Sequence, residues 1–450
     1  MLRRNFLNAS GAGVTAAVLA ACGGGGEALM GAGGSDSSSE LQKDSRSTRP
    51  STTTTTATAT NYKSRVIVIG GGMGGATVAK YLRLWGDAIG VTLIERMPTY
   101  TSNIMSSLVL TGQRSLSSIT YNYDTLRSKY GIKTVFGDVV SIDPAAAKVT
   151  LSNGDIYEAD RIVMAPGIDF DTVEGLGDSD KMPHAWKAGS QTTLLAKQLS
   201  AMRSGNVVLT IPKVPYRCPP GPYERACLIA DWLKVKKPGS KLFVLDANDK
   251  IVVEKENFES AFKDLYGNVV EYVPNAEVVS VDPSKMLLNT AAGQFTGAVI
   301  NMIPRQKAGS LITTAGLNNS PDGRFAGVNV LSYASTVSGA EKVHIIGDSS
   351  ATTQPKAGHI ANQEAKVCAD AISRILSGGS PDPAPVTNSA CFSTITMTQA
   401  SWLSAGYQFD ATSATMKVVP AAFGASAGWS KDNFDEMGTW FKSLMSDSFA

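Results

Sequence analysis

The run Val66-Ile67-Val68-Ile69-Gly70-Gly71-Gly72-Met73-Gly74-Gly75 decides the fold of this 450-residue chain. Its first four residues are continuously apolar, which is typical of a strand buried on both faces of a parallel sheet. Gly70, Gly72 and Gly75 follow in the G-x-G-x-x-G register, and a helical pattern runs over 76–84. Such glycines provide a tight turn, room for a pyrophosphate and close helix packing, while the helix N-terminus offers free N–H groups to the phosphate.

The next expected strand, 91–94, ends at Glu95, which comes about 20 residues after the glycine motif, where a dinucleotide fold holds a ribose hydroxyl. A glycine-rich turn that binds nothing is the alternative interpretation. The combination of strand, helix and acidic residue favours a dinucleotide-binding βαβ unit instead.

Two later segments point to a flavin rather than a nicotinamide. The expected strand 161–164 closes on Ala165-Pro166-Gly167, and the strand 343–346 ends in Gly347-Asp348. Their order after the glycine motif resembles the two-dinucleotide-binding-domain flavoproteins of the disulfide-reductase-like superfamily. The resemblance implies that Asp348 contacts the ribityl–phosphate arm of FAD and that the helix after Gly358 points its N-terminus at the flavin ring. The residues predicted to bind FAD are Gly70, Gly72, Gly74, Gly75, Glu95, Arg96, Ala165, Pro166, Gly167, Asp348, Lys356 and Gly358.

A second nucleotide-like fold begins with the expected strands 206–211 and 241–246, but it lacks the phosphate-binding motif. The loop 212–225 between them contains no G-x-G-x-x-G, and its five prolines remove backbone N–H donors. The sequence therefore predicts no ordinary NAD(P)H site. Electrons are expected to come from a small substrate and to leave to a protein or a quinone.

The loop itself carries a more specific resemblance. Cys218-Pro-Pro-Gly-Pro-Tyr-Glu-Arg-Ala226 resembles the signature of the flavoprotein subunit of flavocytochrome c sulfide dehydrogenase, and the segments 183–189, 301–304 and 355–358 resemble other parts of that family. The similarity extends from about Arg65 to the C-terminus. It implies a periplasmic FAD protein that oxidises sulfide and passes electrons singly to a c-type cytochrome. The chain contains no Cys-x-x-Cys-His, so the haem would belong to a partner.

Cys218 and Glu224 are the predicted catalytic residues. Cys218 matches the first of the family's two redox cysteines, and it precedes a helix expected to open with proline, a place that favours a thiolate. Glu224 is the candidate base for the incoming sulfur nucleophile. An inert buried thiol and a carboxylate that complements the helix dipole are the respective alternatives.

The sequence departs from the family at two positions. The second redox cysteine falls near 322–326, where Phe325 or a neighbour stands in its place. Some members attach the flavin to a cysteine where this chain has Ser102, so the FAD is expected to be non-covalent. Cys227 could replace the missing thiol, but a helix would carry it into the core. Cys391 and Cys368 are expected to be structural, and the three histidines lack metal-ligand spacing, so no metal site is predicted.

The first residues are expected to form an export signal rather than part of the fold. Arg3-Arg4 resembles a twin-arginine motif, and Leu19-Ala-Ala-Cys22 resembles a lipobox, so the predicted location is the periplasm, with a lipid anchor at Cys22 or a plain cleaved signal as alternatives. Charges nearly cancel, with 41 Lys and Arg against 39 Asp and Glu, which argues against a nucleic-acid partner. We expect no membrane contact beyond that anchor.

The fold class predicted is α/β, with two Rossmann-like domains of the disulfide-reductase type and a C-terminal α+β region. The boundaries are 1–22 for the signal, 23–61 for a flexible Gly/Ser/Thr-rich tether, 62–180 and 311–384 for the FAD domain, 181–310 for the second nucleotide-like domain and 385–450 for the C-terminal region. The predicted function is FAD-dependent oxidation of sulfide or a related sulfur compound. The alternatives are a different electron donor on the same scaffold, or a non-catalytic FAD-binding subunit for electron relay or assembly.

Overall fold

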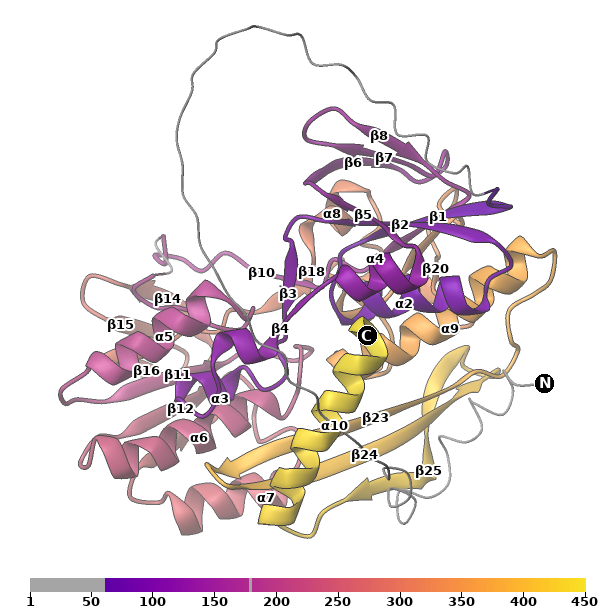
Figure 1. The fold of residues 1–450 in the computed structure, drawn as a ribbon. Helices are drawn as coiled ribbons and strands as arrows, with labels where there is room; N and C mark the ends of the chain where they lie inside the picture. The colour runs from indigo at the N-terminus through magenta and orange to yellow at the C-terminus, as the bar shows by residue number, and fades with distance from the viewer. Residues whose placement is uncertain (1–60, 178–179) are drawn as a thin grey trace, which may run out of the picture. The chain divides into compact units, whose positions relative to one another are not determined.

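The computed structural model describes residues 61–177 and 180–450 (Figure 1). The predicted signal, the twin-arginine motif, Cys22 and nearly all of the predicted tether lie outside the described residues. The predicted fold class is confirmed: two parallel α/β sheets are followed by a strand-rich C-terminal region.

The first sheet has eight strands in the order β22-β19-β20-β21-β9-β1-β2-β5. Five consecutive strands, β21, β9, β1, β2 and β5, are parallel, and the four before the edge strand β5 have the buried cores expected of strands covered on both faces. One face packs against α2 and α9, and the other against β6–β8 and α8. The bounds are β1 Ser64–Ile69, β2 Ile89–Glu95, β5 Lys133–Phe136, β9 Arg161–Met164, β19 Ala326–Asn329, β20 Ala334–Ser335, β21 Val343–Ile345, β22 Ser350–Ala351, α2 Met73–Trp85, α9 Gly358–Leu376, β6 Val139–Asp143, β7 Lys148–Leu151, β8 Ile156–Glu158 and α8 Ser310–Thr314.

Chain order reverses within this sheet between β1 and β9, because β2 and β5 extend it in one direction and β9 and β21 in the other. In open parallel sheets, ligands bind at the carboxyl ends of the strands at such a switch point. Gly70 follows β1 and Ala165 follows β9, so the two predicted turns meet there. The helix begins at Met73, earlier than the periodicity indicates, because Gly72 is extended and acts as its N-cap.

The second sheet is four-stranded and parallel, in the order β13-β12-β11-β17. The proline loop follows β11 and leads into α6, and β10 pairs with β18 where the chain passes between the two sheets. The bounds are β11 Val207–Ile211, β12 Leu242–Asp246, β13 Val270–Val273, β17 Val299–Asn301, β10 Ile168–Phe170, β18 Gln306–Ala308, α5 Ser190–Ala201, α6 Gly221–Lys236, α7 Lys255–Ser260, β14 Val278–Asp282, β15 Leu287–Thr290 and β16 Gly293–Thr296.

The C-terminal region is an antiparallel sheet of β23 Val386–Thr396, β24 Gln399–Asp410 and β25 Thr415–Ala425, followed by α10 Lys431–Phe449. β23 packs against both α6 and α9, while α10 packs against β24 and α2 (Figure 1). The last elements of the chain are thereby brought against the start of α6 and the start of α9. The remaining short elements are β3 Thr99–Thr101, α3 Ser107–Leu110, β4 Thr120–Asn122 and α4 Asp124–Tyr130.

Candidate active site

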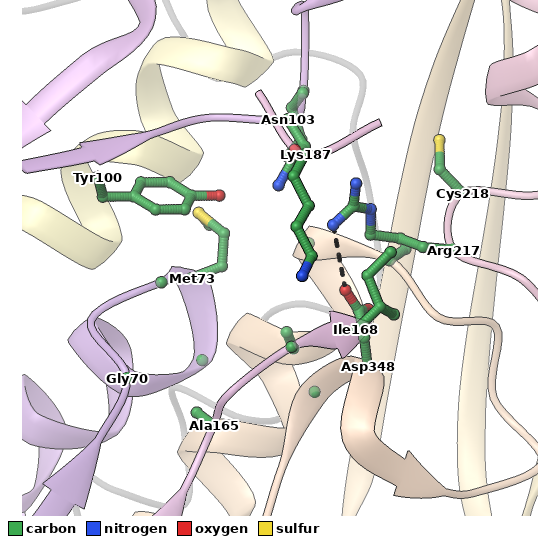
Figure 2. Close-up of a pocket in the computed structure, with 18 of the residues that line it drawn as sticks. Gly70, Met73, Tyr100, Asn103, Ala165, Ile168, Lys187, Arg217, Cys218 and Asp348 are labelled. Carbon is green, nitrogen blue, oxygen red and sulfur yellow. Dashed lines mark ion pairs between the residues drawn. The ribbon is translucent and has the colours of Figure 1, made fainter. Parts of the chain in front are cut away.

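A cavity of about 430 Å³ lies where the carboxyl ends of β1, β2 and β9 face the proline loop and the C-terminal strands (Figure 2). Most of the residues predicted from sequence line it, although they come from distant segments. Those that do are Gly70, Gly72, Gly74, Glu95, Arg96, Ala165, Pro166, Gly167, Cys218, Glu224, Asp348 and Gly358.

The glycine end of the cavity has the backbone that a pyrophosphate requires. Gly70 has φ +94°, and a Cβ there would lie 2.5 Å from the carbonyl oxygen of Ala165. A Cβ on Gly75 would lie 1.7 Å from the carbonyl oxygen of Gly70, so this glycine serves helix–strand packing and does not line the cavity. The N-terminal N–H groups of α2 remain available for an anion.

Glu95 is held in position at the end of β2. Its Oε2 accepts a hydrogen bond from the Gly71 amide at 2.6 Å, and its Oε1 accepts from the Arg96 amide at 2.8 Å. The Arg96 side chain is exposed and lies 3.7 Å from Asp138. The carboxylate of Glu95 lines the cavity at the place where a dinucleotide presents its ribose.

The surroundings of Asp348 show that the cavity suits a cofactor with hydroxyl groups. Its Oδ2 lies 3.8 Å from Nη1 of Arg217, whereas its buried Oδ1 has no hydrogen-bond partner among the described residues (Figure 2). Burial raises the pKa of this carboxyl, while Arg217 and Lys356 lower it. A buried acceptor without a partner, facing a cavity, is satisfied by a hydroxyl-bearing ligand such as the ribityl arm of FAD.

Cys218 lies at the other end of the cavity, three residues before α6. Its backbone has φ +56°, and its amide donates to the carbonyl oxygen of Lys356 at 2.7 Å. Figure 2 shows its sulfur directed away from the Arg217–Asp348 pair. The sequence favoured a thiolate here, but burial raises the pKa of the thiol well above its usual range, and the charges of Cys391 and Glu224 add to this. The desolvation cost outweighs the favourable charge of Arg217.

Glu224 lies in the first turn of α6 and also lines the cavity. Its Oε1 accepts a hydrogen bond from the Thr394 hydroxyl at 2.6 Å. Burial raises its pKa to about 7, although the bonds from Thr394 lower it. A carboxyl group with a pKa near neutrality can take up and release a proton at working pH, as the predicted base must.

Lys356 does not line the cavity. Its Nζ lies 3.7 Å from the centre of the Phe325 ring and donates to the carbonyl oxygen of Ser350 at 2.7 Å. Phe325 is only 3% exposed and belongs to the core beneath the first sheet. Phe325, the residue that stands in place of the second cysteine, therefore faces the core, and no residue of 322–326 lines the cavity.

Sequence reasoning missed Cys391, which was expected to be structural. It is partly exposed and lines the cavity from β23 together with Ala390 and Phe392, and Trp440 of α10 lines the same cavity. By contrast, Cys227 and Cys368 are fully buried in two separate cores, as their helical patterns predict. No local pattern around Cys391 indicates which side of the strand faces a ligand.

The second sheet has its own acidic residue at the end of β12, but this residue is already bound. Oδ2 of Asp246 accepts hydrogen bonds from the hydroxyls of Tyr223 at 2.7 Å and Tyr272 at 2.8 Å. Asp246 is completely buried. The carboxylate that would hold a nicotinamide dinucleotide's ribose is thus occupied by two side chains of the protein.

Two kinds of site are absent from residues 61–177 and 180–450: a metal cluster and a membrane-spanning helix. These residues contain no cluster of three or more His, Cys, Asp or Glu side chains suited to a metal ion. None of the helices in these ranges has the length and apolar character needed to cross a membrane.

Three segments of the chain match known protein families. Residues 192–304 match the central-domain profile of the sulfide dehydrogenase (flavocytochrome c) flavoprotein chain, and 383–449 match the flavin-binding profile of flavocytochrome c sulphide dehydrogenase. Residues 64–201 match the pyridine nucleotide-disulphide oxidoreductases.

Individual relatives agree with these profiles. The chain is 47% identical over 45 residues to the sulfide dehydrogenase (flavocytochrome c) flavoprotein chain of Chlorobaculum thiosulfatiphilum, a match covering 10% of this chain and 94% of that sequence. It is 26% identical over 339 residues to apoptosis-inducing factor homolog B of Dictyostelium discoideum, a match that covers 71% of this chain and 83% of that protein. The solved sulfide:quinone oxidoreductase of Aquifex aeolicus superposes with a TM-score of 0.70 at 19% identity, covering 85% of this chain and 91% of that one, which shows a shared fold.

Proposed function

Because the chain belongs to the family of the flavocytochrome c sulfide dehydrogenase flavoprotein chain and is an FAD-dependent oxidoreductase, we propose that it oxidises sulfide and delivers the electrons to a c-type cytochrome. The observation that carries this proposal is a single cavity with a dinucleotide-binding end at Gly70 and a thiol–carboxyl end at Cys218 and Glu224.

The residues present fit FAD at three points: the glycine turn against Ala165, the fixed Glu95 carboxylate and the unpartnered Oδ1 of Asp348. When bound, FAD accepts two electrons from a donor and can release them singly. Ser102 stands where some relatives have a cysteine, so the cofactor is held without a covalent bond to that position.

The protein's own groups act on the substrate. H₂S entering the cavity gives its proton to Glu224, whose pKa near 7 lets it serve as base, and the resulting HS⁻ stays in the cavity that the thiol of Cys218 lines. Lys187 lies at the same cavity, as does Arg217, so anionic sulfur is met by positive charge (Figure 2). The carboxylate of Asp246 is hydrogen-bonded to two tyrosine hydroxyls and is not free to hold the ribose of NADH. This supports a small molecule, rather than NADH, as the electron donor.

A separate cytochrome is supported by the family and by the absence of a haem-attachment motif in the chain. Export to the periplasm is supported by the twin-arginine-like Arg3-Arg4, and lipid anchoring by Cys22.

Anaerobic titration of the FAD-loaded protein with sulfide tests the proposal. We expect the flavin absorption bands to bleach at near-stoichiometric sulfide, and we expect Cys218→Ser to lose this response while dithionite still reduces its flavin. The matched control is Cys368→Ser, which removes a thiol from the core. An unchanged oxidised spectrum of the wild-type protein with sulfide would instead favour a different donor on this scaffold. Flavin that only a partner protein reduces would favour the relay subunit.

A further inference from the structure

Cys391 shares a cavity with Cys218, although the two lie in different domains of the sequence. β23, which contains Cys391, is held against the second nucleotide-like domain by hydrogen bonds that involve side chains. Thr394 donates to Glu224 at 2.6 Å, and the Tyr266 hydroxyl donates to the Ile395 carbonyl at 2.6 Å. The strand is therefore fixed beside the start of α6, where Cys218 and Glu224 lie.

The two thiols are also electrostatically linked. Burial is the largest cause of the raised pKa of Cys218, and the charge of Cys391 is the next. Glu224 acts on both thiols in the same direction. Two thiols and one carboxyl group thus line the same cavity, and the pKa of each thiol depends on the charge of the carboxyl group.

A second carboxyl group, that of the partly exposed Glu254, is bonded to the strand that contains Cys391. Glu254 accepts hydrogen bonds from the hydroxyls of Ser393 at 2.6 Å and Ser401 at 2.5 Å, both from the C-terminal sheet. After burial, its charge is the largest influence on the pKa of Cys391. Glu224 therefore influences both cavity thiols, and Glu254 influences Cys391 as well.

We propose that Cys218 and Cys391 form the oxidisable thiol pair of this enzyme, with Cys391 as the sulfur that sulfide attacks. The inference rests on the proposed sulfide oxidation and assigns a catalytic role to a residue of the C-terminal sheet. Of the four cysteines that the described residues contain, these two line the cavity, whereas Cys227 and Cys368 are buried in cores.

The chemistry balances with the groups available. In the oxidised protein the two sulfurs are bonded to each other. HS⁻ attacks Cys391, forming a persulfide there and breaking the bond to Cys218, which keeps the electron pair as a thiolate. A second HS⁻ removes the outer sulfur as hydrogen disulfide and leaves Cys391 as a thiolate. Re-forming the Cys218–Cys391 bond from the two thiolates releases two electrons, for which FAD would be the acceptor, and the proton taken up with them would come from the released hydrogen disulfide.

Peptide mapping of the FAD-loaded full chain tests the pair without sulfide. The protein is oxidised anaerobically with ferricyanide, its free thiols are alkylated, and it is digested without reductant. We expect a linked species that joins the peptides containing Cys218 and Cys391. It should be absent from Cys218→Ser and Cys391→Ser and retained in the core control Cys368→Ser.

Flavin reduction by sulfide then tests the catalytic role. Cys391→Ser should bind FAD and be reduced by dithionite normally, yet its reduction by sulfide should be at least tenfold slower than in Cys368→Ser. Absence of the linked peptide, together with a wild-type sulfide rate in Cys391→Ser, would overturn the pair while leaving sulfide oxidation intact. A linked peptide in a protein whose flavin sulfide does not reduce would support the pair and contradict the proposed donor.

Discussion

The Thr394 hydroxyl donates a 2.6 Å hydrogen bond to the carboxylate of Glu224, which lies 170 positions earlier in the chain. This bond joins the C-terminal sheet to the first turn of α6. It also acts on the chemistry, because a hydrogen bond to the charged form of a carboxyl group lowers its pKa. The C-terminal sheet therefore both encloses the cavity and adjusts the base within it.

Replacing Thr394 with valine should move the pH dependence of sulfide oxidation to higher pH. Without the bond, the pKa of Glu224 rises above about 7, so less of the base is deprotonated at neutral pH. We expect flavin reduction at pH 7 to slow on the order of threefold to tenfold and to recover above pH 9. Stopped-flow measurements from pH 5 to 10 would check this. Thr396→Val, which alters the hydroxyl of the last residue of β23, a group bonded to the Thr398 amide and not to Glu224, should leave the profile unchanged.

Glu224→Gln should stabilise the protein at alkaline pH. The folded-state pKa is raised from 4.5 to about 7, so the folded state binds this proton more tightly than the unfolded state does. The stabilisation from that proton is complete below pH 4.5 and is lost as the pH rises to 7. The variant should gain about 1–3 kcal/mol over wild type at pH 8 and little at pH 4.5. Urea denaturation at the two pH values measures the difference, and an equal gain at both would refute this account.

Gly75→Ala should prevent FAD loading. The added methyl would lie 1.7 Å from the Gly70 carbonyl oxygen, so the turn and α2 must move apart. We expect purified protein without flavin absorbance or with severely reduced yield. Gly438→Ala is the matched control, because a Cβ there meets no atom within 4 Å and the residue lies inside α10. That change should raise stability by about 0.5–1 kcal/mol and retain FAD.

NADH and NADPH should fail to reduce the flavin. The second sheet lacks the glycine motif, and Asp246 is bound by Tyr223 and Tyr272. Anaerobic addition of either nucleotide at millimolar concentration should leave the flavin spectrum oxidised, while dithionite bleaches it. Rapid bleaching by NADH would show that this domain accepts a dinucleotide by another route.

The sequence alone determined the features that depend on neighbours in the chain. The strand, the glycine turn and the helix at 66–85 follow from contiguous residues, because burial on both faces and positive φ each select particular side chains. Glu95 and the proline-opened α6 were found in the same way, at the end of a strand and the start of a helix, whereas the role of Asp348 followed from the resemblance to the disulfide-reductase-like flavoproteins. These local patterns were sufficient for the first βαβ unit, and the resemblance supplied the two-domain fold class and most other residues of the cavity.

Tertiary structure alone decided which distant residues share that cavity. Cys391 faces it because β23 packs against α6 and α9, and Lys356 turns away because its ammonium group lies over the Phe325 ring. The pKa values of Cys218 and Glu224 likewise depend on burial, which local sequence does not specify. A helix N-terminus predicts a thiolate, but desolvation in a closed cavity is the larger effect, and it arises only when the three parts of the chain come together.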